Sequence, residues 1–409
     1  MTISRRTLVT GVAAGAAFAS LGRPARAQGA DTLKIGVLTD LSGPYKDIGG
    51  PGSVACANQA IEDFGASGKG MKVEVVSADH QNKTDVGSAV ARQWYDRDGV
   101  DIILDIPNSG VALAVSSVAR EKNKIFIGSG PATSDLTGAQ CSPNTIHWTY
   151  DTYMLAKSTG GALVKAGGTT WYFITADYAF GKALQRDTTT FIEKAGGKVV
   201  GSSAYPFPGT SDFSSLLLQA QSSGAKVLGL ANAGADTINS IKQAHEFGLP
   251  LTIAGLLVFI SDVHSLGLET AQGLTLTSSF YWDHNDHTRA FADRVKSKMG
   301  SARPGMVQAG VYSSTLHYLK TAAQMGVAEA KKDGAATVAA MKRLPVDDDC
   351  FGKTTIREDG RCLTPAFLWK VKKPSESKGP WDYYTLLNET PGDEAYRPLS
   401  EGNCKLVHA

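Results

Sequence analysis

The sequence predicts an α/β fold made of two similar lobes, and three observations lead to this fold class. From residue 33 to about residue 133, apolar runs of strand length alternate with segments of helical apolar spacing, a pattern typical of a parallel sheet with right-handed crossovers. The same alternation starts again near Tyr150 and continues to residue 255. The chain of 409 residues is also longer than one hydrophobic core usually supports.

The first series of elements follows from local patterns. Short apolar runs that end in clusters of Ser, Gly, Pro or Asn predict strands, and apolar side chains that recur every three or four positions predict helices. In chain order, the expected strands are 33–38, 71–77, 100–106 and 124–127, and the expected helices are 53–64, 85–98 and 111–120.

The second series repeats these patterns and is followed by additions. Its expected strands are 170–175, 198–205, 227–230 and 251–255, and its expected helices are 150–165, 178–195, 213–222 and 236–247. Two later helices, 288–299 and 308–325, are expected to join the first lobe. We therefore expect a first lobe at 28–149 plus 278–343, a second lobe at 150–277 plus 344–372, and an extended surface strap at 373–409.

The N-terminus has the three parts of an export signal. Arg5 and Arg6 form a twin-arginine pattern, an apolar run covers residues 8–21, and Ala25 and Ala27 match a small-x-small cleavage site. The apolar run is too short for a membrane-spanning helix. Residues 1–27 are therefore predicted to be a twin-arginine signal peptide, and the mature protein is predicted to be periplasmic.

Five cysteines in an exported chain cannot all pair with one another. Cys350 and Cys362 flank a predicted hairpin turn, so they are predicted to form a disulfide across paired strands. Cys141 and Cys404 are the second candidate pair, and Cys56 is expected to be a buried free thiol on a helix.

Two turns of the first series are candidates for binding an anion. They follow the third and fourth predicted strands, at 107–110 and 128–133, and contain Ser, Asn, Thr and Gly. Open α/β sheets place ligands at the carboxyl ends of their strands, and N–H groups at a helix N-terminus suit an anion. This corner is therefore the first place where we expect a ligand.

Four motifs in a fixed order resemble a known family. They are Leu-Ser-Gly-Pro-Tyr at 41–45, Gly-Pro-Ala-Thr at 130–133, Asp-Tyr-Ala-Phe-Gly at 177–181, and a late hairpin at 351–360. Together they resemble the type I periplasmic solute-binding proteins of the branched-chain amino acid transporter group, over essentially the whole mature chain. The resemblance implies two Rossmann-like lobes, three hinge crossings and a ligand in the cleft between the lobes.

The resemblance also implies a carboxylate site on the first lobe. In that family the loops after the third and fourth strands bind the ligand's carboxylate through hydroxyl and backbone donors. The matching positions are Asn108, Ser109, Ser129, Gly130, Pro131 and Thr133. The same residue types are typical of turns and helix N-caps, which use the same N–H groups, so the pattern alone allows either role.

Other positions are candidates for the rest of the cleft. The resemblance places Tyr178, Phe180, Asn232 and Ala233 on the second lobe's side. The remaining candidates are Tyr45 in the first turn and Tyr150 and Tyr153 at the predicted hinge. Each of these rings either lines the cleft or packs beneath it.

One departure from the family bears on the ligand. Amino-acid-binding members usually have an acidic side chain after the strand at 251–255, where it pairs with the ligand's α-ammonium. This chain has Leu-Leu-Val-Phe-Ile at 256–260, so Leu257 is expected in an apolar wall and the nearest acid is Asp262. Because a buried unpaired ammonium is costly, we expect a small carboxylate with an apolar, aromatic body. An alignment shifted by a few residues would give Asp262 or Asn232 the acid's role, so an amino acid or amide is the alternative.

These observations favour a receptor for a small organic acid in an ABC importer, which closes on its ligand and delivers it to a membrane permease. We expect a monomer without a cofactor, and not an enzyme; an exported cleft enzyme and a soluble sensor are the rivals. Lys and Arg total 41 against 39 Asp and Glu, and no basic cluster interleaves with aromatics, so nucleic acid is not expected as a partner. The acidic segments 283–287 and 347–349 lack regular metal-ligand spacing and are expected to be solvated loops.

Overall fold

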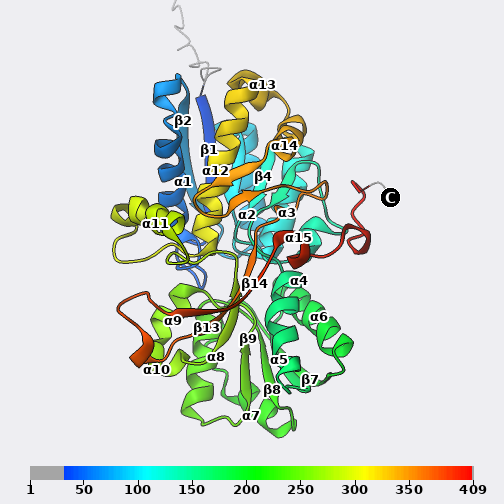
Figure 1. Cartoon of the computed structure of the whole chain (residues 1–409). Coiled ribbons are helices and arrows are strands. Elements are labelled where there is room, and N and C mark those ends of the chain that lie inside the picture. Colours follow the sequence, from blue (N-terminus) through cyan, green and yellow to red (C-terminus); the bar gives the residue numbers. More distant parts are fainter. Residues whose placement is uncertain (1–31, 408–409) are drawn as a thin grey trace, which may run out of the picture.

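The computed structural model describes residues 32–407, which form two lobes lying one above the other (Figure 1). The first lobe contains a parallel sheet in the order β2-β1-β3-β4-β5. Its strands are β1 (Thr32–Thr39), β2 (Lys72–Asp79), β3 (Ile102–Asp105), β4 (Ile125–Gly128) and β5 (Thr145–His147). The interior strands β3 and β4 are buried throughout, as expected for a parallel sheet covered on both faces.

Helices cover both faces of this sheet because successive side chains of each strand point in opposite directions. Ile102 and Leu104 pack toward α1 and α12, whereas Ile103 packs toward α2 and α3. These helices are α1 (Gly50–Phe64), α2 (Thr84–Gln93), which continues into the π-helical segment η2 (Trp94–Asp98), α3 (Ser109–Glu121) and α12 (Met306–Met325). The other helices placed in this lobe are α11 (Asp286–Met299), α13 (Val327–Lys332) and α14 (Gly334–Arg343).

The second lobe repeats the arrangement with a parallel sheet in the order β7-β6-β8-β9. Its strands are β6 (Thr170–Ala176), β7 (Lys198–Tyr205), β8 (Val227–Ala231) and β9 (Thr252–Gly255). Its helices are α4 (Thr152–Leu155), the π-helical η4 (Ala156–Gly160), α5 (Gly161–Lys165), α6 (Ala179–Lys194), α7 (Ser214–Ser222), α8 (Ala235–Glu246), α9 (Ile260–Leu266) and α10 (Leu268–Ala271). The predicted α/β class with two lobes is confirmed.

Segments that follow β5, β10 (Thr275–Ser278) and β12 (Gly352–Thr354) connect the lobes. After β14 (Tyr384–Thr390) the chain returns to the first lobe, where Arg397 donates to the carbonyl oxygen of Ser134 at 2.9 Å. Arg361, in the segment after β12, is fully buried and lies against the segment after β5. Its Nη1 donates to the carbonyl oxygen of Tyr150 at 3.2 Å and lies 3.7 Å from Asp151 Oδ2. Arg361 also forms a parallel bridge with His147. A buried guanidinium therefore joins two of the hinge segments.

The C-terminal part of the chain differs from the expectation at two places. Residues 344–365, expected in the second lobe, lie against the first: β11 (Val346–Asp348) contacts α12, where Ser313 Oγ donates to Asp348 at 2.6 Å. The expected surface strap contains β14 (Tyr384–Thr390), which pairs antiparallel with β13 (Ala366–Val371) in the sheet β10-β13-β14. Sequence pattern missed β14 because most of its side chains are exposed and show no alternation. The short helix α15 (Gly392–Ala395) follows it.

The cysteines agree with one predicted pair and correct the other. Cys141 and Cys404 form a disulfide, which fastens the C-terminal segment to the first lobe, and Cys56 is a buried free thiol. The predicted Cys350–Cys362 disulfide is wrong, because both thiols are buried and free. The hairpin turn expected between them exists, but Cys362 lies opposite Ile356, and Cys350 lies earlier, in the tight turn between β11 and β12.

The predicted signal peptide at 1–27 lies outside the residues that the structure describes. Among residues 32–407, none of the helices is both long enough and apolar enough to span a lipid bilayer.

Candidate ligand-binding cleft

The carboxyl ends of the two parallel sheets face each other across a small apolar space between the lobes. The cavity volume there is about 10 Å³, room for about one water molecule, so the lining residues nearly fill the space. Its lining residues are Tyr45, Ile48, Pro107, Ala132 and Tyr150 from the first lobe and hinge, and Tyr178, Phe180, Ala233, Leu257 and Phe259 from the second lobe. These ten residues, which we call the cleft wall, include no acidic or basic side chain.

The lobes contact each other directly at this point, so the structure is a closed form. The hydroxyl oxygens of Tyr45 and Tyr178 lie 2.5 Å apart and share a hydrogen bond between the lobes. The backbone N–H of Ala235 donates to the carbonyl oxygen of Pro44 at 3.2 Å. Gly234, at φ +60°, permits this approach, because a Cβ there would lie 2.5 Å from the same carbonyl oxygen.

Aromatic rings form much of the wall. Phe207 stacks on Tyr178 with ring centroids 4.6 Å apart and on Tyr45 at 5.2 Å. Tyr150 meets Phe259 edge-on at 6.0 Å. The hydroxyl of Tyr150 donates to the carbonyl oxygen of Gly130 at 2.6 Å, which holds its ring beside the loop after β4. Rings placed in this way suit a flat or branched apolar ligand body.

The polar groups lie at the first lobe's end of the cleft, behind Pro107 and Ala132. Ser109, the first residue of α3, is buried, and its Oγ accepts hydrogen bonds from the N–H groups of Ala132 and Thr133, both at 3.2 Å. Asn108 caps α3 by accepting from Val111 N at 3.1 Å, and Thr133 accepts from Asp135 N at 3.3 Å. Two loops therefore converge on one hydroxyl with backbone donors around it, an arrangement that suits a carboxylate.

The structure brings six of the sequence-predicted positions into the cleft wall: Tyr45, Tyr150, Tyr178, Phe180, Ala233 and Leu257. Behind the wall lie Asn108, Ser109 and Thr133, described above, and Ser129, Gly130 and Pro131. Ser129 Oγ is buried and makes no hydrogen bond with the described residues, and the carbonyl oxygen of Pro131 lies 2.7 Å from His147 Nε2.

Two predicted positions lie elsewhere. Tyr153 packs edge-on against Phe191 at 5.0 Å. Asn232 is committed to its own lobe, accepting from Thr237 Oγ1 at 2.7 Å and donating to Ser240 Oγ at 3.1 Å.

Four wall residues and one ring behind them were not among the sequence-predicted positions. Pro107, Ala132 and Phe259 lie within motifs that the sequence singled out, so their neighbours indicated them. Ile48 and Phe207 carried no comparable signal.

Asp262, the alternative partner for a ligand ammonium, does not belong to the cleft wall. Its buried carboxylate accepts from the N–H of Phe259 at 2.9 Å at the start of α9, and burial raises its pKa to about 7. Asp262 therefore caps a helix behind the apolar run.

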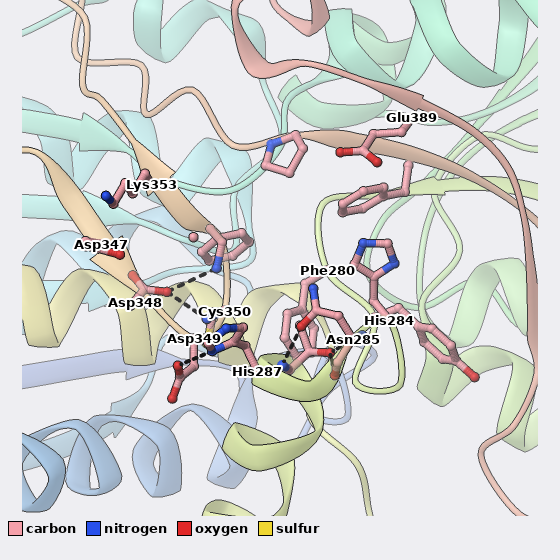
Figure 2. A pocket seen from close by; sticks show the side chains of 16 residues that line it. Phe280, His284, Asn285, His287, Asp347, Asp348, Asp349, Cys350, Lys353 and Glu389 are labelled. Carbon is pink, nitrogen blue, oxygen red and sulfur yellow. Dashed lines mark hydrogen bonds and ion pairs between the residues drawn. The ribbon is translucent and has the colours of Figure 1, made fainter.

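The acidic segments noted in the sequence meet in a second cavity, outside the cleft (Figure 2). His287 Nδ1 lies 3.1 Å from Asp349 Oδ1, and Arg294 Nη2 donates to Asp349 Oδ2 at 2.7 Å. Despite partial burial, hydrogen bonds from Arg294 and His287 keep the pKa of Asp349 below its ordinary value. No group of three or more His, Cys, Asp or Glu side chains within residues 32–407 is arranged to hold a metal ion.

The two-lobed fold and the closed interlobe space define a solute-binding protein. The sequence model of the periplasmic binding protein family matches residues 32–379, and the chain belongs to that family, in the branched-chain amino acid-binding group that the sequence motifs indicated.

Known relatives cover nearly the whole described chain. A periplasmic binding protein from Burkholderia mallei is 48% identical, with a TM-score of 0.89, covering 93% of this chain and 100% of that one. A branched chain amino acid ABC transporter periplasmic ligand-binding protein from Burkholderia xenovorans is 40% identical, with a TM-score of 0.79, covering 91% and 99%. The Leu/Ile/Val-binding protein homolog 6 of Brucella melitensis is 25% identical over 337 residues, 80% of this chain and 84% of the relative.

More distant structures share the fold alone. A solute-binding protein of an ABC transporter from R. palustris, solved in complex with benzoate, is 19% identical with a TM-score of 0.78, covering 88% of this chain and 97% of that one.

Proposed function

We propose that this protein is the periplasmic receptor of an ABC importer, and that it captures a small monocarboxylate with an apolar, aromatic body in the interlobe cleft. The observation that carries this proposal is the cleft wall, in which rings and aliphatic side chains surround a small space and no charged side chain is present. Relatives are named as binding branched-chain amino acids or were solved with benzoate, so both ligand classes occur on this fold.

The carboxylate would bind at the first lobe. The N–H groups of Ala132 and Thr133 already point at one acceptor, Ser109 Oγ, at 3.2 Å. A ligand oxygen that replaced the hydroxyl as acceptor would gain two backbone donors, and Ser109 could then donate its own proton. Hydrogen bonds to an ionised acceptor are stronger than those to a hydroxyl, which favours this exchange.

The body of the ligand would lie against the second lobe. An α-amino acid would bring an ammonium group into a wall without an acid, since Asp262 and Asn232 are committed to other hydrogen bonds. Leaving a buried ammonium unpaired is costly, and the apolar wall therefore selects against it. Aromatic carboxylates carry no such group.

Delivery to the permease would depend on closure. The Tyr45–Tyr178 hydrogen bond and the contact of Ala235 with Pro44 exist only when the lobes meet. A ligand that bridges the lobes adds contacts to the closed state and shifts the population toward it.

The test is calorimetry of the mature protein, starting at Gln28, against benzoate and L-leucine. We expect benzoate to bind at least tenfold more tightly than L-leucine. Tight binding of L-leucine with no response to benzoate would overturn the assignment of the ligand class. Mass spectrometry of whatever co-purifies identifies the natural ligand, and recovery of unchanged benzoate after incubation distinguishes a receptor from a cleft enzyme.

A further inference from the structure

Beneath the loops of the proposed carboxylate site lies a buried acid, Asp105, at the end of β3. It is 0% exposed, and neither of its carboxyl oxygens makes a hydrogen bond with any described residue. Gly49 and Gly130 flank it closely: a Cβ at either glycine would lie 2.6 Å from a carboxyl oxygen of Asp105. The side chain therefore fills a space that two glycines leave open for it.

The backbone at Asp105 is strained in a way that keeps the carboxyl in this place. Asp105 has φ +80° and the next residue, Ile106, has φ +61°, a conformation that β-branched side chains rarely adopt. The strain is held by two hydrogen bonds, from Ile106 N to Leu38 O at 3.0 Å and from Gly130 N to Asp105 O at 3.4 Å. Strain of this kind clusters at functional sites.

No positively charged side chain among the described residues faces Asp105. The titratable groups that face it are Asp40 at the end of β1, Cys56 on α1 and Tyr150 at the hinge. The hydroxyls of Thr39 and Ser53 lie close to the carboxyl and oppose the effect of burial on its pKa only in part, because neither is placed at full hydrogen-bond geometry. Burial, with a smaller contribution from Asp40, raises the pKa of Asp105 to about 7.

Asp40, a neighbouring buried acid, shows what an ionised carboxylate requires here. Its oxygens accept hydrogen bonds from the N–H groups of Ser42 at 3.2 Å, Gly43 at 2.6 Å and Tyr45 at 2.8 Å, and from Asn82 Nδ2 at 2.6 Å. Asp105 has none of these donors. The fold therefore provides for a charge on Asp40 and not on Asp105.

We propose that Asp105 carries a proton whenever a carboxylate occupies the cleft, so that the site takes up its ligand together with one proton from solvent. This inference rests on the proposed function. Gly130 connects the two places: it contacts the Asp105 carboxyl on one side, and its loop continues to the N–H groups of Ala132 and Thr133. Two negative charges separated only by this loop, in the buried interior, would repel each other. Protonation of Asp105 removes the repulsion.

The proposal predicts proton uptake that can be measured directly. We would titrate benzoate into the mature protein between pH 6 and pH 9, in pairs of buffers with different ionisation enthalpies. Above neutral pH, the wild type should take up about one proton per benzoate, and its affinity should fall about tenfold per pH unit. Asp105→Asn should bind benzoate with no net uptake and with a flat pH profile.

Asp262→Asn is the matched comparison, because Asp262 is also buried with a pKa of about 7 but lies in the other lobe. Its proton uptake should equal that of the wild type. The proposal is wrong if uptake is lost in Asp262→Asn and kept in Asp105→Asn, or if the wild type binds benzoate at pH 8 without taking up a proton.

A second measurement needs no ligand. Infrared difference spectra between pH 6 and pH 9 should contain a protonated-carboxyl band that titrates near neutrality. In the Asp262→Asn background, which lacks the other buried acid with a pKa of about 7, this band should be lost when Asp105→Asn is added. If benzoate binds at no pH, the proposed ligand class fails, but the infrared band still decides the state of Asp105. An Asp105 that is ionised at pH 6 would overturn the inference by itself.

Discussion

The two faces of the cleft use different chemistry. The first lobe presents backbone N–H groups and hydroxyls at the ends of β3 and β4, where Ser109, Ala132 and Thr133 meet. The second lobe presents Phe180, Leu257 and the ring of Tyr178. Hydrogen-bond donors recognise a functional group that many ligands share, whereas a shaped apolar wall distinguishes their bodies. Under the proposed function, the first lobe would therefore anchor the ligand and the second lobe would select it.

The largest expected effect tests the buried acid under the polar face. The pKa of Asp105 is raised from 3.8 to about 7, so between these pH values the folded protein binds a proton that the unfolded chain does not. The contribution of Asp105 to the free energy of unfolding should therefore fall by about 4 kcal/mol as pH rises from about 4 to about 7. Asp105→Asn should remove this contribution, so its stability relative to the wild type should increase over the same range. Urea unfolding at pH 4, 5.5 and 8 measures the difference, and a constant difference would mean that Asp105 does not titrate in this way.

The next largest effect tests whether the second lobe's side of the cleft has to be free of negative charge. Leu257→Asp places a charge in the cleft wall, where Leu257 is buried. A like charge about 6 Å from a ligand carboxylate, at an effective dielectric constant of about 20, costs about 3 kcal/mol, or about 100-fold in affinity. Calorimetry with benzoate at pH 8 measures the loss. Leu257→Asn is the neutral control of the same shape; an equal loss in both variants would assign the effect to packing and not to charge.

A smaller effect tests the polar anchor. Ser109→Ala removes the hydroxyl on which the two loops converge, and we expect benzoate to bind about tenfold more weakly, a loss of about 1–2 kcal/mol. Ser117 lies on the same helix, and its hydroxyl donates only to its own helix at Leu113 O. Ser117→Ala should bind as the wild type does. Unchanged affinity in Ser109→Ala would mean that Ser109 only joins the two loops and does not bind the ligand.

The smallest effect tests the contact between the faces. Tyr178→Phe removes one hydroxyl of the hydrogen bond with Tyr45, and we expect closure, and hence benzoate affinity, to weaken by about 1 kcal/mol. Tyr45→Phe should have a similar effect. The double variant should be no weaker than either single variant, because both remove the same interaction. Additive losses would show that the two hydroxyls act separately.

Much of the polar face was predictable from the sequence, because the residues that form it lie close together in the chain. Asn108 and Ser109 follow one strand directly, and Thr133 follows the next, so strand order alone brings them to one edge of the sheet. The prediction for the second lobe was less complete. Phe207 stacks on rings from both lobes, yet it follows β7 without a motif, and Tyr153, which resembled a hinge residue, packs on Phe191.

The cysteines illustrate the same limit. Cys141 and Cys404 are 263 positions apart and are joined, whereas Cys350 and Cys362 lie near each other in the sequence and remain free. The sequence indicated the hairpin turn between them, but not that Cys350 lies in an earlier turn, outside the pair of segments in which Cys362 lies opposite Ile356.

Hydrophobic periodicity and turn chemistry are properties of short stretches, so the α/β class, the repeated lobes and the two loops of the polar face could be predicted from the sequence alone. Which side chains line the cleft, and which acid is buried without a hydrogen-bond partner among residues 32–407, became apparent only in the folded chain. In the sequence, nothing distinguishes Asp105 from an ordinary strand residue, because Gly49 and Gly130 lie beside its carboxyl only in the folded chain. Tyr45 contacts Tyr178 only when the lobes close. Burial, pairing and closure depend on contacts between distant residues, and no local pattern encodes them.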